Sequence, residues 1–126
     1  MTAERYIISV VLDSFSVEKS GDTFTAGEFY FVVNGKKFPD DGEIKLDEGD
    51  KFKPKYKPTV YWGIKQTKAP KTKLKIKAME KDPGLDDTFL KESVVIDLDE
   101  DKNKIKIKNK NCKLKMKIYV EETDKW

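Results

Sequence analysis

A short acidic stretch contains the residues of this sequence that are best suited to carry chemistry. Residues 79–90 read MEKDPGLDDTFL and place the carboxylates of Glu80, Asp82, Asp86 and Asp87 around a Pro-Gly break. Like charges this close repel one another, so the stretch is either a solvated loop or a site for a cation. Its spacing does not match the pattern of an EF-hand, so a calcium site would need carboxylates from a second loop.

The composition excludes most other kinds of active site. The chain of 126 residues has no histidine and one cysteine, Cys112, which removes His-based catalytic triads, imidazole acid–base catalysis and Cys- or His-ligated zinc. A glycoside hydrolase needs only a carboxylate pair, but this length leaves little room for a deep substrate cleft. We therefore expect no enzyme. Cys112 cannot form an internal disulfide and is expected to be a small buried hydrophobe.

The basic residues are almost all lysine, since only Arg5 of the 26 Lys and Arg residues is arginine. Sequence-specific nucleic-acid recognition favours the planar guanidinium of Arg, so we do not expect it here. A content of 39% charged residues is also typical of thermophile proteins. No apolar run could span a bilayer, and the N-terminal residues lack the features of a signal peptide. We expect a soluble, intracellular protein, peripheral to a membrane if it docks there.

Apolar and polar residues alternate with a period of two through most of the chain. The runs KLKIKA (73–78), KIKIK (104–108) and CKLKMKIYV (112–120) alternate Lys with apolar residues, which is typical of antiparallel strands with one face on a core. By contrast, YIISVVL (6–12) and FYFVV (29–33) are apolar at both parities, as expected for central strands. The inward positions are predicted to be Leu74, Ile76, Ala78, Ile105, Ile107, Cys112, Leu114, Met116, Ile118 and Val120.

Turn signals divide these runs into strands, and Asn34-Gly35 is a strong hairpin signal. The pattern predicts a single all-β domain over residues 1–126, an eight-stranded antiparallel β-sandwich. The expected strands cover residues 5–13, 27–34, 36–46 with an interruption at Pro39, 50–65, 73–80, 89–98, 103–108 and 112–121.

This strand order brings three acidic loops to one end of the sandwich. Loops 13–28, 47–50 and 80–88 each carry a formal charge of −3, so this end carries −9 and the rest of a chain with net charge +3 must carry +12. Such polarity concentrates cations at the acidic end. Glu80 and Asp82 share strand parity, Asp86 or Asp87 returns after the turn, and Glu28 is expected directly opposite.

The lysine-lined strand faces have two interpretations. They could attract anionic lipid or nucleic acid by charge alone. Aromatic residues do not interleave with the lysines between 104 and 117, however, and solvated lysines that protect sheet edges fit this pattern better.

The acidic loops and strand pattern resemble the C2 domain family over most of the chain. Where that family has Asp-x-Asp at a strand end, another Asp and then Phe-Leu/Ile-Gly, this sequence reads Glu80-Lys81-Asp82, Asp87 and Phe89-Leu90-Lys91. Glu28 stands before Phe29-Tyr30-Phe31, where the family has an Asp before an aromatic-rich strand. Two family Asp residues are thus Glu here, and Lys91 replaces the Gly.

The resemblance implies a Ca²⁺ site at the loop end. Its best ligands are Glu28, Glu80, Asp82 and Asp87, and Asp22 and Asp86 are weaker candidates. Asp13 and Asp22 both remain open as the second ligand of the first loop. Phe24 and Leu85, apolar residues at loop tips, would enter a membrane or partner surface after Ca²⁺ binding, or else pack on the rim of the sandwich.

We therefore expect a noncatalytic, calcium-binding C2-like module that docks through its acidic end on anionic phospholipid or an acidic protein surface. The alternative is a metal-independent structural or assembly protein, similar to a coat module, that presents its edges and loops to copies of itself.

Overall fold

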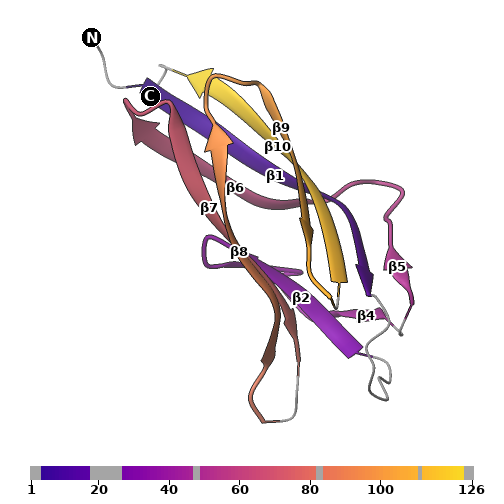
Figure 1. The fold of residues 1–126 in the computed structure, drawn as a ribbon. Coiled ribbons are helices and arrows are strands. Elements are labelled where there is room, and N and C mark those ends of the chain that lie inside the picture. The colour runs from indigo at the N-terminus through magenta and orange to yellow at the C-terminus, as the bar shows by residue number, and fades with distance from the viewer. Residues whose placement is uncertain (1–3, 18–26, 47–48, 82–83, 111, 124–126) are drawn as a thin grey trace.

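The computed structural model describes residues 4–17, 27–46, 49–81, 84–110 and 112–123, and this part of the chain is all β (Figure 1). It contains no helix that could cross a membrane. The strands are β1 (Glu4–Val17), β2 (Gly27–Val33), β3 (Lys36–Phe38), β4 (Ile44–Leu46), β5 (Lys51–Phe52), β6 (Thr59–Thr67), β7 (Lys71–Glu80), β8 (Asp87–Asp97), β9 (Lys102–Lys108) and β10 (Cys112–Thr123).

Two antiparallel sheets face each other across one core. Sheet A has the order β5-β1-β10-β9, with β6 also paired to β1, and sheet B has the order β3-β2-β7-β8, with β4 also paired to β2. This arrangement confirms the predicted antiparallel β-sandwich.

The described strands outnumber the expected ones because two expected strands are each divided. Segment 36–46 becomes β3 and β4, which both pair with β2, and segment 50–65 becomes β5 and β6, which both pair with β1. Proline explains both breaks, since it cannot donate a ladder hydrogen bond. Pro39 follows β3, and Pro54 and Pro58 lie between β5 and β6.

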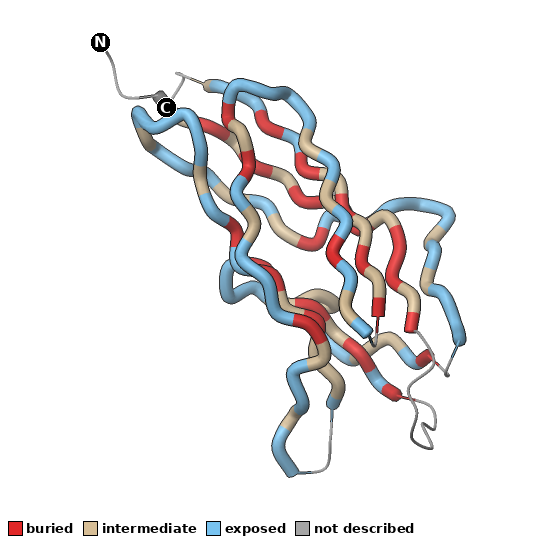
Figure 2. Tube along the Cα trace, in the orientation of Figure 1, coloured by how far each residue is buried: buried red, intermediate tan, exposed pale blue. Residues whose placement is uncertain are grey.

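The core forms where the inward faces of the two sheets meet (Figure 2). Phe15 of sheet A packs on Phe29 and Phe31 of sheet B, with ring centroids 5.5 and 5.0 Å apart. Nearly all predicted inward positions are fully buried, including Cys112, and Ile105 is partly buried. The alternation of lysine with apolar residues therefore predicted the facing of β7, β9 and β10 correctly.

The described ends of the loops that were expected together do lie at one end of the sandwich. The amide of Gly49 donates to the carbonyl of Val17 at 3.0 Å, and the amide of Lys81 donates to the carbonyl of Glu28 at 2.8 Å. Figure 1 shows the hairpin between β7 and β8 extending beyond the rest of the sandwich at this end.

Candidate functional site

The end of the β7–β8 hairpin places two carboxylates opposite each other. Glu80 is the last residue of β7, and its register partners are Phe29 on β2 and Asp87 on β8. Because side chains alternate across a strand, Glu80 shares the inward face of β7 with Ala78 and Ile76, both fully buried. Glu80 and Asp87 thus form a cross-strand pair of like charge on the inner side of sheet B, an arrangement that is destabilising by itself.

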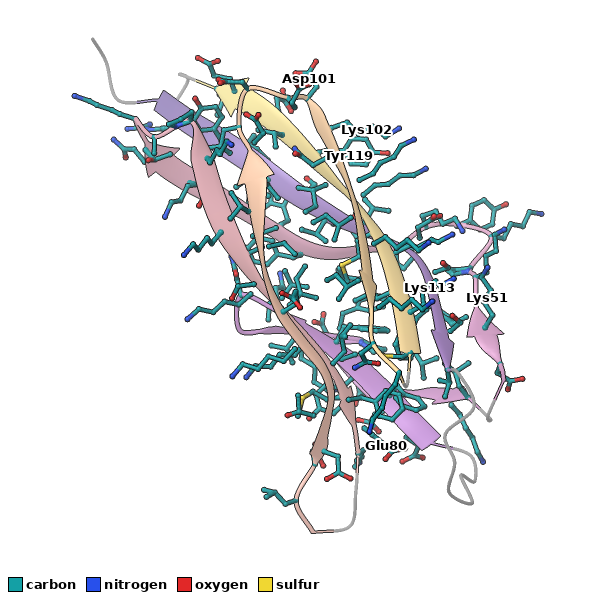
Figure 3. All side chains as sticks on the ribbon, in the orientation of Figure 1. Lys51, Glu80, Asp101, Lys102, Lys113 and Tyr119 are labelled. Carbon is teal, nitrogen blue, oxygen red and sulfur yellow. The ribbon has the colours of Figure 1, made fainter. Side chains whose placement is uncertain are left out.

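The carboxylate of Glu80 lies against the first residue of β2. A Cβ atom built on Gly27 would be 2.5 Å from Oε2 of Glu80 and 2.8 Å from the ring of Phe29. Glycine is therefore required at this position for Glu80 to lie there. Figure 3 shows Glu80 at the loop end of the molecule. The carboxylate of Glu80 thus lies beside the residue at which β2 begins.

The residues beneath the carboxylate of Glu80 are apolar. Phe29 packs against Phe89 of β8, with ring centroids 5.2 Å apart. The side-chain amide of Asn109 donates to the carbonyl of Phe89 at 2.9 Å, which ties the turn between β9 and β10 to the hairpin. The inner side of the hairpin is thus held by contacts from both sheets.

The outer face of the same hairpin holds a different set of charges. The hydroxyl of Tyr30 donates to Oδ2 of Asp86 at 2.5 Å. This hydrogen bond, together with partial burial, raises the pKa of Tyr30 to about 12. Glu43 forms ion pairs with both Lys37, at 3.5 Å, and Lys81, at 3.4 Å. Asp86 and Glu43 on this face therefore have a hydroxyl and two cationic partners, respectively.

The structure divides the predicted ligands between these two faces. Glu28 is exposed and lies opposite Lys81, the residue that follows Glu80. The side chain of Glu28 therefore points to the opposite side of the sheet from that of Glu80. We expected Glu28 to stand directly opposite Glu80 and Asp82, and the pleat of β2 prevents this for Glu80. Among the described carboxylates, Glu80 and Asp87 are on the inner side, and Asp86 is bonded to Tyr30 on the outer side.

Several predicted residues lie outside the described part of the chain, namely Asp22, Phe24 and Asp82. Within the described ranges, no group of three or more Asp, Glu, Cys or His side chains is arranged to hold a metal ion.

Leu85 stands at the tip of the hairpin with 86% of its surface exposed. At this exposure Leu85 does not pack on the rim of the sandwich, and its contact with a membrane or partner stays a prediction.

Asp13 was an alternative ligand for the first loop, and the structure places it elsewhere. It lies at a bulge of β1, where Oδ1 is 3.3 Å from Nζ of Lys57. Burial alone would raise the pKa of Asp13, but the hydrogen bond from Lys57 and the charges of Lys117 and Lys53 lower it below its usual value. Asp13 belongs to a lysine-rich surface of sheet A, so Asp22 is the better candidate.

Tyr30 and Glu43 belong to the loop end but were not predicted there. Tyr30 looked like one more aromatic residue of a central strand, and its partner Asp86 is 56 residues away. Local sequence carries no signal for such a pair. Strand parity could have placed Tyr30 on the outer face with Glu28, but only the hairpin register brings Asp86 to it.

Comparison with known proteins supports the fold. No family model and no curated protein sequence gives a significant match. Among solved structures, human GIVD cytosolic phospholipase A2 in complex with methyl gamma-linolenyl fluorophosphonate aligns with a TM-score of 0.61 at 14% identity. A second structure of this human enzyme aligns with a TM-score of 0.59 at 14% identity. Its complex with the inhibitor and terbium chloride aligns with a TM-score of 0.55 at 16% identity.

These alignments cover 98% of this chain but only about 18% of the phospholipase chains, which contain a C2 domain. At such low identity the likeness shows an all-β fold shared with a part of those chains. The phospholipase activity resides in a protein far longer than the region that is matched.

Proposed function

We propose that this chain is a noncatalytic, C2-like docking module whose acidic end binds Ca²⁺ and then attaches to an anionic membrane surface. The β-sandwich, the meeting of acidic loops at one end and the likeness to chains that contain a C2 domain support this proposal. One of those chains was solved with terbium chloride, and terbium is a hard cation that prefers oxygen ligands as calcium does.

The observation that carries the proposal is the placement of Glu80. Its carboxylate lies over Gly27, where the β1–β2 loop enters sheet B, and Asp87 stands opposite it. A cation between these carboxylates would replace repulsion by attraction. We therefore narrow the proposed ligand set to Glu80 and Asp87, completed by Asp82 and Asp22 from the adjoining loops, with backbone carbonyls and water filling the six to eight oxygen positions that calcium takes.

The docking mechanism follows from charge and exposure. Without metal, the acidic end is repelled by an anionic surface. Bound Ca²⁺ would reverse this, since open coordination positions can accept phosphate or carboxylate oxygens. Leu85 at the exposed tip of the hairpin, together with Phe24 of the first loop, would then bury apolar surface, worth about 1 to 2 kcal/mol each. An acidic protein surface could be bridged by the same chemistry.

Melting and cosedimentation test the proposal together. A ligand that binds only the native state stabilises it by about 2.7 kcal/mol at a hundredfold excess over Kd, so Ca²⁺ should raise the melting temperature relative to EDTA. Vesicles of phosphatidylcholine and phosphatidylserine should sediment the chain in Ca²⁺, and the change Leu85→Ala should weaken this without weakening Ca²⁺ binding. Identical melting curves and identical sedimentation in Ca²⁺ and EDTA would favour the metal-independent assembly protein.

A further inference from the structure

On the outer face of sheet A, lysine stands directly opposite lysine at three alternate positions of β9 and β10. The pairs are Lys108 with Lys113, Lys106 with Lys115 and Lys104 with Lys117. We call these residues the lysine ladder. The intervening residues Ile107, Leu114 and Met116 are buried, so the ladder lysines project away from the core.

This ladder costs stability. Like charges directly opposite on neighbouring strands are destabilising, and no ladder lysine forms an ion pair within the described part of the chain. Protection of a sheet edge explains lysines on β9, which is the edge strand. It does not explain the lysines of β10, which lies between β1 and β9. An anionic partner would explain them, because it removes the repulsion.

The basic surface extends from the ladder onto the neighbouring strands. Lys51 pairs with Ser16, which itself pairs with Lys113, so Lys51 continues a row of the ladder across β1. Lys53 and Lys57 approach the same surface, since both act on Asp13. Asp13 and four ladder lysines line a shallow hollow of about 210 Å³. Asp13 is the one carboxylate among the residues that line this hollow, and its charge is already matched by Lys57. A second carboxylate of this face, Glu121, pairs with Ile7 farther along β1.

An apolar strip borders the lysines on the same face. Ser9 of β1 pairs with Tyr119 on one side and with Trp62 on the other, and Ile7 pairs with Ile64. Trp62, Ile64 and Tyr119 are 49%, 45% and 41% exposed, which is high for large apolar side chains. Figure 3 shows Tyr119, Lys102, Lys113 and Lys51 along one side of the molecule, away from Glu80.

We propose that this face of sheet A is a calcium-independent docking surface for a bilayer that contains anionic phospholipid. The lysine ladder would lie over the phosphate headgroups, and Trp62 and Tyr119 would enter the interface, where aromatic residues with a polar atom are favoured. The face is distinct from the acidic end and does not depend on the proposed calcium site.

The arrangement of the face favours a bilayer over a nucleic acid. Proteins that bind single strands interleave aromatic residues with basic ones, so that bases stack along the charged path. Here Tyr119 stands at the end of the ladder, opposite Lys102, and Trp62 lies across β1, so neither stands between two ladder lysines. The ladder also consists of lysine, which acts as a point charge, whereas base recognition favours arginine.

Vesicle binding in EDTA tests the proposal. The full chain should bind phosphatidylcholine vesicles that contain phosphatidylserine, not vesicles of phosphatidylcholine alone, and high salt should release it. The triple change Lys106→Gln, Lys115→Gln and Lys117→Gln should weaken vesicle binding about 100-fold. This figure follows from the usual binding free energy of one lysine close to an anionic membrane surface. The same variant should melt at an equal or higher temperature, because neutralisation relieves cross-strand repulsion.

A matched control lies on the opposite face of the sandwich. The change Lys73→Gln, Lys75→Gln and Lys77→Gln removes the same charge from the outer side of β7 and should leave most of the binding in place. Trp62→Ala should weaken binding, and Trp62 fluorescence, followed in a Trp126→Phe background, should shift to the blue on vesicles. Equal losses in both triple variants would overturn the proposal, as would binding to a single-stranded oligonucleotide with none to vesicles.

Discussion

The hydroxyl of Tyr30 donates a 2.5 Å hydrogen bond to Oδ2 of Asp86, which ties the outer face of β2 to the β7–β8 hairpin just before β8 begins. The bond favours the protonated phenol beside the carboxylate, and it raises the pKa of Tyr30 to about 12. Together with the contacts of Phe89 and Lys81, this bond helps to fix the position from which Glu80 and Asp87 project.

Removal of the carboxylate should return Tyr30 towards an ordinary phenol. We expect Asp86→Asn to lower the pKa of Tyr30 from about 12 to nearer 10. The pKa can be followed by near-ultraviolet absorbance, with Tyr30→Phe subtracted to isolate this tyrosine. Asp87→Asn removes the neighbouring charge without touching the bond and should leave the pKa high. Equal titrations of Asp86→Asn and wild type would contradict the bond.

The same bond gives a stability change in alkaline solution. Since the pKa of Tyr30 is raised on folding, its contribution is fully present below the unfolded value of about 10 and is lost as pH rises towards about 12. Wild type should therefore be more stable than Tyr30→Phe near neutral pH, by about 1 kcal/mol. Urea unfolding at rising pH should show this difference shrink.

Asp13 should give the opposite pH dependence. Its pKa is lowered on folding, so its contribution is present above the unfolded value of about 3.9 and is lost as pH falls through the folded value. Asp13→Asn should cost at most about 1 kcal/mol at neutral pH, since the pair with Lys57 is partly exposed. The two proteins should converge in acid.

Gly27 should not tolerate a side chain. Gly27→Ala would bring a methyl group against Oε2 of Glu80 and the ring of Phe29, and we expect a loss of about 1 to 3 kcal/mol in the free energy of unfolding. Gly84, in the β7–β8 hairpin, has open space around a Cβ atom built on it, so Gly84→Ala should be nearly neutral. Equal stability of the two variants in urea would contradict a close contact of Gly27 with the ring of Phe29.

The aromatic contact between the sheets should dominate the core. Phe31→Ala removes a fully buried ring that packs on Phe15, and we expect a loss of about 3 to 5 kcal/mol. Tyr56 is 82% exposed, so Tyr56→Ala should change stability by no more than about 0.5 kcal/mol. Chemical denaturation of both variants compares the two sites directly.

The strands could be predicted from sequence because their signal is local. Alternation fixed the inward side of β7, β9 and β10, and Asn34-Gly35 marked the turn between β2 and β3. The breaks after Phe38 and Phe52 were harder to place, because β-segments that flank a proline still pair with the same neighbour. Of the two breaks, only the one after Phe38 was predicted, from the position of Pro39.

The candidate site was less predictable, because it depends on register. A shift of one residue moves a side chain to the other face of a sheet. Sequence placed Glu28 and Glu80 at the same end but could not show that β2 pairs Phe29, and not Glu28, with Glu80. The lysine ladder has the same origin: alternation predicts outward lysines on β9 and β10, and only the register sets them opposite each other.

Calcium titration calorimetry on two double variants tests the central claim most directly. Glu80→Gln with Asp87→Asn neutralises the inner pair, and Glu28→Gln with Asp86→Asn removes the same charge from the outer face. We expect wild type and the outer variant to bind Ca²⁺, and the inner variant to lose most of its affinity. Absence of binding to wild type, or an equal loss in both variants, would contradict it.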